Sequence, residues 1–249
     1  MIRIPFSRRK NPADVRQKEF SRASLLQRLE RRVLLNAVPD VSIDVVDEAL
    51  IGETVDFEIT FDLDDLAPGP GYGPFIDVVL PRNGADGADG MDTPDGIGTE
   101  DPVSFEFFGT SLSPVLDVIV DNSGTVLHPL LRNPDGSPTE VSNLTPGDRF
   151  IVLQLPLGSY EPTTIPLTVT GTANVSNLAD VGFDLPIKVR GGFQFGCDPE
   201  DNPSIDDPND TVSTFESDVV TPEVLMINKV VNAEEGETAT GRNFPKSYT

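Results

Sequence analysis

Alternation of apolar and polar side chains with a period of two constrains the fold of this chain more than any other feature. Between Val55 and Leu63 every second side chain is a large hydrophobic one, and those between are Asp, Glu or Thr. Successive side chains of a β-strand point to opposite faces, so the pattern predicts a strand with one buried and one solvent-facing side. A helix would instead repeat its apolar positions every three to four residues.

Further short apolar runs predict additional strands, at residues 41–46, 75–80, 103–108, 115–120, 150–155, 165–170 and 183–189, with a shorter one at 193–195. Clusters of Gly, Pro, Asn, Asp and Ser separate them and predict turns, at 68–71, 122–124, 133–136, 146–148 and 191–192. Eight or nine short strands without a helical period between them favour an all-β, antiparallel, Ig-like β-sandwich.

The first 36 residues differ from the rest in charge and in pattern. Residues 1–37 contain ten Arg and Lys against three Asp and Glu, whereas the other 212 residues contain eight against 38. Within the basic part, Leu25, Leu26, Leu29 and Val33 share one face of a helix predicted over residues 12–36. On its residues alone, this segment has two open interpretations: a basic amphipathic helix on a membrane surface, or a segment without structure.

The charge split also limits the partners. An acidic body argues against nucleic acid as a partner, because phosphate binding depends on Lys and Arg. The apolar run at residues 33–35 is much shorter than the core of an ordinary secretory signal peptide. No run of 18 apolar residues occurs in the sequence, so no transmembrane segment is expected.

Residues 29–37, Leu-Glu-Arg-Arg-Val-Leu-Leu-Asn-Ala, resemble the LEPR-XLL motif found near the N-terminus of very large bacterial surface or secreted proteins. Six positions match the pattern Leu-Glu-Pro-Arg-x-Leu-Leu-Ser-Ala: Leu29, Glu30, Arg32, Leu34, Leu35 and Ala37. Arg31 replaces the Pro of the motif, and Asn36 replaces its Ser. The resemblance covers about a tenth of the chain and implies export to an extracellular or cell-surface location.

A repeated motif suggests the domain organisation. Pro39-Asp40-Val41 is followed by Gly-Glu-Thr at 52–54, and Pro222-Glu223-Val224 by Gly-Glu-Thr at 236–238. We therefore predict a targeting segment at 1–38, a β-sandwich module at 39–197, an acidic linker at 198–221 and a truncated start of a second module at 222–249. The Pro-x-Val…Gly-Glu-Thr opening also resembles repeat domains of giant surface proteins and isopeptide-forming fimbrial domains, which implies a stalk or adhesion module.

The residues required for catalysis are scarce. His128 is the only histidine, it lies in an apolar stretch, and no Gly-x-Ser-x-Gly elbow is present, so a structural histidine is expected. Cys197 is the only cysteine, which excludes an intramolecular disulfide and makes zinc binding improbable. We expect no enzymatic activity, no bound organic cofactor and no phosphate-binding loop.

Calcium is the metal ion that the sequence suits best. Asp86, Asp89, Asp92 and Asp95 recur every three residues in a Gly-rich loop, and Ca²⁺ prefers such oxygen ligands. The spacing is not that of an EF-hand, so a solvated loop without metal is the alternative.

An intramolecular isopeptide bond, like those of isopeptide-forming fimbrial domains, requires a lysine in one strand and an asparagine in its neighbour. Lys229 occupies the expected position in the second copy, whereas Val45 or Val46 occupies it in the first. Lys188 is the only lysine between residues 39 and 221. We therefore predict no cross-link in the complete module.

The sequence thus predicts a non-enzymatic structural or adhesive module of a secreted or cell-surface protein. Its expected partners are other modules of the same chain and cell-surface or extracellular-matrix components. The alternative is a cation- or glycan-binding β-sandwich, although the absence of Trp leaves little aromatic surface for sugars.

Overall fold

A computed structural model describes residues 37–63, 69–85, 94–99, 103–133, 135–161, 165–196 and 212–225. The helix predicted over residues 12–36 lies outside this part of the chain. All regular elements within it are β-strands.

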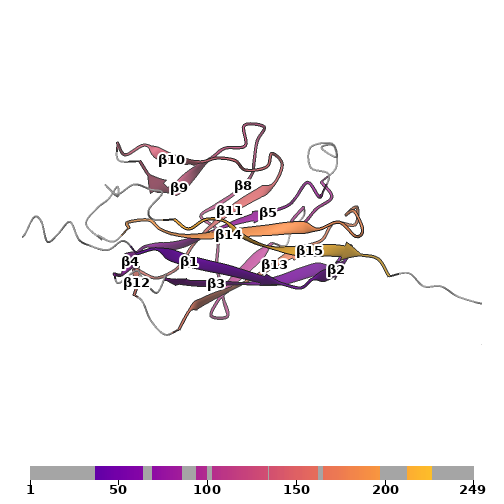
Figure 1. Cartoon of the computed structure of the whole chain (residues 1–249), viewed down its shortest axis with the longest axis horizontal. Helices are drawn as coiled ribbons and strands as arrows, with labels where there is room; N and C mark the ends of the chain where they lie inside the picture. Colours follow the sequence, from indigo (N-terminus) through magenta and orange to yellow (C-terminus); the bar gives the residue numbers. More distant parts are fainter. Residues whose placement is uncertain are drawn as a thin grey trace, which may run out of the picture.

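Two sheets lie face to face (Figure 1). The five-stranded sheet has the order β1 (Pro39–Val45), β3 (Thr54–Leu63), β13 (Leu167–Asn174), β6 (Ser104–Phe107) and β7 (Thr110–Ser111). The six-stranded sheet has the order β2 (Glu48–Leu50), β15 (Glu216–Glu223), β14 (Leu185–Phe193), β5 (Pro74–Leu80), β11 (Arg149–Gln154) and β8 (Leu116–Ile119). Every ladder within the two sheets is antiparallel except β15–β2. The predicted antiparallel sandwich is confirmed.

The main core lies between the two sheets. The apolar members of the alternating run, from Val55 to Leu63, all point inward and are at most 5 % exposed. Opposite them, Leu185, Ile187 and Val189 of β14 are fully buried. The period-two pattern therefore correctly predicts which side of β3 faces the core.

A second core covers the outer face of the six-stranded sheet. The β-hairpin of β9 (Val126–Arg132) and β10 (Pro138–Val141) supplies Leu131 and Val141 to this cluster. They pack with Phe75 and Val79 of β5. As a result, all seven residues of β5 and the four central residues of its neighbour β11 are buried, whereas its other neighbour, β14, alternates over its first six residues. A shorter pair, β4 (Gly71–Tyr72) and β12 (Ser159–Tyr160), completes the described strands.

The module boundary predicted at residue 197 is too early. β15 includes residues 216–221 of the predicted linker; its residues 216–220 pair with β14 and its residues 221–223 with β2. Val220 is fully buried in the main core. The acidic beginning of this strand shows no apolar alternation, which is why the sequence pattern does not reveal it. The sandwich therefore extends at least to Glu223.

The turn predicted at Gly191 and Gly192 is also wrong, since both residues lie inside β14. A Cβ atom at Gly192 would fall 2.1 Å from the ring of Phe75, its neighbour on β5, and one at Gly191 would fall 2.4 Å from Val41. Here glycine makes room for buried side chains instead of reversing the chain.

Candidate functional site

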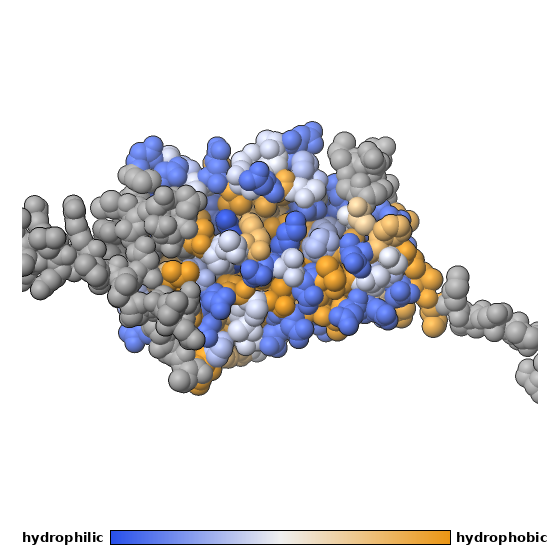
Figure 2. Space-filling model, in the orientation of Figure 1, coloured by the Kyte–Doolittle hydropathy of each residue, from blue (hydrophilic) through white to orange (hydrophobic). Residues whose placement is uncertain are grey.

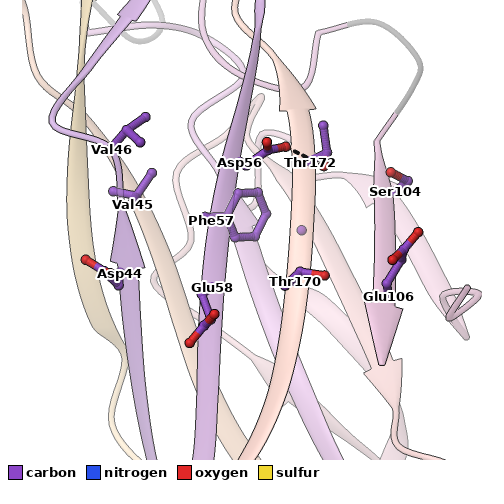
Figure 3. Close-up of a pocket in the computed structure, with 11 residues that line it drawn as sticks. Asp44, Val45, Val46, Asp56, Phe57, Glu58, Ser104, Glu106, Thr170 and Thr172 are labelled. Atoms are coloured by element: carbon purple, nitrogen blue, oxygen red, sulfur yellow. Dashed lines mark hydrogen bonds between the residues drawn. The ribbon is translucent and has the colours of Figure 1, made fainter. Parts of the chain in front are cut away.

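A hollow lies on the outer face of the five-stranded sheet (Figure 3). It has a volume of about 480 Å³ and is formed by β1, β3, β13 and β6. Because the apolar side chains of these strands point to the core, the alternate polar ones point outward. The acidic members of the alternating pattern are thereby gathered on one surface.

Strand register aligns three carboxylates and one hydroxyl in a row across this face. Asp44 of β1 lies opposite Glu58 of β3, Glu58 opposite Thr170 of β13, and Thr170 opposite Glu106 of β6. Directly opposed side chains in a sheet lie about 5 Å apart, so the negative charges of Asp44 and Glu58 repel each other. Such a row is tolerated here because the face is open to solvent.

A second row, parallel to the first, adds hydroxyl groups. Thr172 of β13 donates its hydroxyl hydrogen to Asp56 of β3 over 2.7 Å, and it lies opposite Ser104 of β6. Gly171 and the ring of Phe57 line the hollow between the rows (Figure 3). No Lys, Arg or His is among the residues that line it.

This surface, which we call the acidic hollow, is suited to a cationic or hydroxyl-rich ligand. Its carboxylates accept hydrogen bonds, and uncompensated negative charge attracts cations. The described residues contain no group of three or more His, Cys, Asp or Glu side chains arranged to hold a metal ion.

A buried charged cluster lies behind the six-stranded sheet. Asp77 of β5 is completely buried and accepts hydrogen bonds from His128 Nε2 over 3.0 Å and from Arg190 Nε over 2.7 Å. The Arg190 guanidinium carbon also lies 4.8 Å from the centroid of the Phe215 ring. The carboxylate thus receives a donor on each oxygen, which compensates for its burial.

The hydrogen bonds of His128 define its tautomer. Its Nδ1 accepts the backbone N–H groups of Leu130 at 3.2 Å and Leu131 at 2.9 Å. A nitrogen that accepts carries no hydrogen, so the ring is neutral and Nε2 bears the hydrogen donated to Asp77. Both ring nitrogens are therefore engaged with the protein itself, and the residue anchors the β9–β10 hairpin to β5.

Asp148 is a second buried carboxyl group. Burial raises its pKa to about 6, although the positive charge of Lys188 and hydrogen bonds from Thr145 and the Asn83 backbone act in the opposite direction. The side chain of Asn83 is also buried, and its amide donates to the Pro146 carbonyl over 3.2 Å. This arrangement fixes the turn before β11 against the end of β5.

Only some of the predicted site residues lie within the described part of the chain. Asp86, Asp89 and Asp92 lie outside the described residues, whereas Asp95 is described, so the calcium site stays a prediction. Of the targeting motif, Leu29, Glu30, Arg32, Leu34 and Leu35 also lie outside, and only Ala37 is described, fully buried in the main core. Cys197 and Lys229 belong to the undescribed part of the chain as well.

Sequence reasoning missed both the acidic hollow and the Asp77 cluster. The outward-facing acids of residues 56–62 were the signal for the hollow, but two of the strands that complete it, β6 and β13, are more than 40 residues away in sequence. No local pattern marks Asp77, His128 and Arg190 as neighbours, because the residues come from three separate strands.

Comparisons with known proteins do not assign a family. No family model and no curated protein matches the chain. Among solved structures, AvmM, which catalyses macrocyclization in alchivemycin A biosynthesis, is 12 % identical with a TM-score of 0.40, covering 78 % of this chain and 92 % of that one. Two others are equally remote. The major pilin subunit BcpA of Bacillus cereus is 8 % identical with a TM-score of 0.32, covering 74 % of this chain and 40 % of its own. A cohesin module from a Clostridium perfringens glycoside hydrolase is 12 % identical with a TM-score of 0.31, covering 76 % and 99 %.

These similarities are too weak to carry a functional argument. In the described residues, no helix is long and apolar enough to cross a bilayer.

Proposed function

We propose that this chain is a non-enzymatic structural or adhesive β-sandwich module of a large secreted or cell-surface bacterial protein. The observation that carries the proposal is the internal use of His128, the one histidine of the chain, whose two ring nitrogens bond to a buried carboxylate and to backbone amides. A group held in this way serves the fold and is not presented to a substrate.

The distribution of apolar side chains supports the same proposal. Two cores, one between the sheets and one beneath the β9–β10 hairpin, bury large side chains on both faces of β5. A sandwich stabilised on both faces of a central strand suits a module that bears load or presents a surface. The surface location itself rests on the motif at residues 29–37.

Localisation of the protein in the bacterium that encodes it tests this proposal. Labelling of intact cells with an antibody against the sandwich should detect the wild-type protein. The double substitution Leu34→Asp and Leu35→Asp should abolish surface labelling while the total amount of protein stays similar. Leu25→Asp with Leu26→Asp, which lies outside the motif, is the matched control. Two results contradict the proposal: surface labelling that the motif variant does not reduce, and a wild-type protein that is confined to the cytoplasm.

A second candidate function is binding of a cationic ligand in the acidic hollow, which the row of Asp44, Glu58 and Glu106 favours. Calorimetric titration with a lysine-rich peptide is expected to show binding that weakens as salt is raised, because screening shortens the reach of these charges. Glu58→Gln with Glu106→Gln should weaken it at least tenfold. The pair Glu140→Gln and Glu216→Gln removes two exposed carboxylates that lie outside the hollow and should leave binding unchanged. If both double substitutions lower the affinity for the peptide equally, the attraction is non-specific and does not depend on the acidic hollow.

A further inference from the structure

The six-stranded sheet ends at β8, which has a neighbouring strand on one side only (Figure 1). That neighbour is β11, and no described strand lies beyond β8 on the other side. On the face drawn in Figure 2, hydrophobic residues lie in small groups between hydrophilic ones. An unpaired strand edge is a binding surface of another kind, because its backbone N–H and C=O groups can pair with a further strand.

The backbone of β8 presents unpaired groups at this edge. Val120 donates its N–H to the Asp148 carbonyl over 2.8 Å, and the residues of an antiparallel strand direct their backbone groups alternately to its two sides. Val118 therefore bonds to β11, whereas the N–H and C=O groups of Asp117 and Ile119 point away from it. Among the described residues, no backbone hydrogen bond engages these outward groups.

The other long sheet edge is closed by the fold itself. β1 is the first strand of the five-stranded sheet, but it lies against β14 and β15 of the opposite sheet. The Val45 N–H of β1 donates to the Asp218 carboxylate of β15 over 3.0 Å. The side chains along β8 are more open, since Ile119 is 46 % and Val115 is 44 % exposed. The edge of β8 is therefore the one that a further strand can reach.

The charges beside β8 do not protect this edge by repulsion. Arg149 donates Nε and Nη2 to the Asp117 carboxylate over 2.7 Å and 2.6 Å, which neutralises the acid of the strand. Next to this pair lies a hollow of about 380 Å³ that is lined by Arg82, Arg149 and Ile119. Among the described residues, no carboxylate forms an ion pair with the Arg82 guanidinium. The hollow can therefore receive a carboxylate from a partner.

A second copy of β8 fits this edge in one antiparallel register. If Asp117 pairs with Ile119 of the partner copy, and Ile119 with the partner's Asp117, all the outward backbone groups of both strands become bonded. Val118 then lies opposite Val118 of the partner copy. A shift of two residues in either direction would place Asp117 opposite an acid, the partner's Asp117 or Asp121, and directly opposed like charges are destabilising. The favoured register brings the partner's Asp117 beside Ile119, on the side of the hollow that Arg82 lines.

We propose that two copies of this protein join through β8, in an antiparallel pairing that continues the six-stranded sheet of one copy into that of the other. The contact is symmetric, so it closes after two copies and does not produce a filament. It does not require the cell-surface role proposed above, because it rests on the unpaired edge and on the charges beside it.

Sedimentation velocity of the full 249-residue chain over a range of protein concentrations measures this dimer. Ile119→Pro removes an outward N–H without removing a bond to β11, and it should weaken dimerisation at least tenfold. Ser111→Pro is the matched control at the edge of the other sheet. The Leu112 N–H donates to the Phe105 carbonyl over 2.8 Å, so the Ser111 N–H points away from β6. This control should leave the dimer unchanged, and thermal melts should show that both variants remain folded.

Cysteine cross-linking tests the register. In a Cys197→Ser background, Val118→Cys places two thiols opposite each other in a non-hydrogen-bonded pair, where the Cα atoms lie about 4.5 Å apart. This separation permits a disulfide, so oxidation with copper phenanthroline should give a covalent dimer. Ile119→Cys, which lies opposite the partner's Asp117, should give at least tenfold less of it.

Arg82→Glu tests the charge at the hollow. It should also weaken the dimer at least tenfold, because it brings a negative charge to the position that the partner's Asp117 approaches. A dimer that Ile119→Pro or Arg82→Glu leaves unchanged overturns the proposal, as does equal cross-linking of the two cysteine variants. A protein that stays monomeric at every concentration overturns it too, and would leave the β8 edge to a strand of another protein.

Discussion

The buried carboxylate Asp77 is satisfied by partners from distant strands, although Arg190 Nη2 in the same cluster is buried without a hydrogen-bond partner among the described residues. The two oxygens of Asp77 are shared between His128 and Arg190, which lie 51 and 113 residues away. A buried charge without such partners is strongly destabilising, whereas a fully bonded one fixes how its neighbours pack.

Substitution of His128 by Ala should destabilise the sandwich by about 3 kcal/mol, because it leaves a carboxylate oxygen and two backbone amides without partners in the interior. Urea denaturation followed by circular dichroism measures the effect. Leu127→Ala, at the exposed neighbouring position, should change the free energy of unfolding by less than about 0.5 kcal/mol. Equal effects of the two variants would contradict the role assigned to the cluster.

Asp148 predicts an unusual dependence of stability on pH. Its pKa rises from 3.8 to about 6 on folding, mainly through burial, so the folded protein binds this proton more tightly than the unfolded chain. The destabilising effect of the charged form is complete above pH 6 and disappears as the pH falls toward 4. Asp148→Asn should therefore raise stability by about 2 kcal/mol at pH 7. Its advantage over the wild type should shrink between pH 7 and pH 4 in thermal unfolding; an advantage independent of pH would refute the assignment.

At the scale of elements, sequence patterns predict regular strands better than hairpins and glycine positions. The strands at β1, β3, β5, β6, β8 and β11 were predicted to within two residues, because each alternates or forms a bounded apolar run. The β9–β10 hairpin was missed since both of its strands are amphipathic in an irregular way, with a register shift between them.

Gly171 lies inside β13, where an added side chain would collide with a buried aromatic ring. A Cβ atom at Gly171 would lie 2.3 Å from the ring of Phe57, its partner across the β3–β13 ladder. Gly171→Ala should therefore lower the free energy of unfolding by about 2 kcal/mol through overpacking. At Gly158 a Cβ atom would meet nothing within 4 Å, so Gly158→Ala is the control and should be nearly neutral. If Gly171→Ala is equally neutral in denaturant titrations, Phe57 has room to move.

The β6–β7 hairpin contains a strained residue. Phe107 and Thr110 pair across a two-residue turn in which Phe108 has φ 49° and Gly109 has φ 71°. Such a turn favours Asn before Gly, and the Phe108 ring is 69 % exposed. Phe108→Asn should stabilise the protein by about 1 kcal/mol, measured as a higher melting temperature. A lower one would show that the Phe107–Phe108 ring contact, at 4.4 Å between centroids, outweighs the strain.

At the scale of the whole molecule, apolar cores between the two sheets and beneath the covering hairpin stabilise the sandwich, and we predict no covalent cross-link in it. Lys188 lies in β14 with Val79 and Ser217 as its backbone neighbours, and no asparagine is opposite it in either ladder. We predict that the intact mass of the purified chain equals the 26.9 kDa expected from its sequence. A mass lower by one ammonia would demonstrate a Lys–Asn bond, and peptide mapping would locate it.

The fold class and the facing of β3 can be predicted from the amino-acid sequence, because side-chain alternation is a local property that burial on one side directly imposes. The sequence also separated a basic N-terminal segment from an acidic body. The pairing of strands is visible in the three-dimensional structure alone, and with it the hollow formed by the acids of β1, β3 and β6 and the contact of Asp77 with His128 and Arg190. It moved the end of the module to Glu223 as well. These features depend on pairing between distant segments, for which a local pattern contains no information.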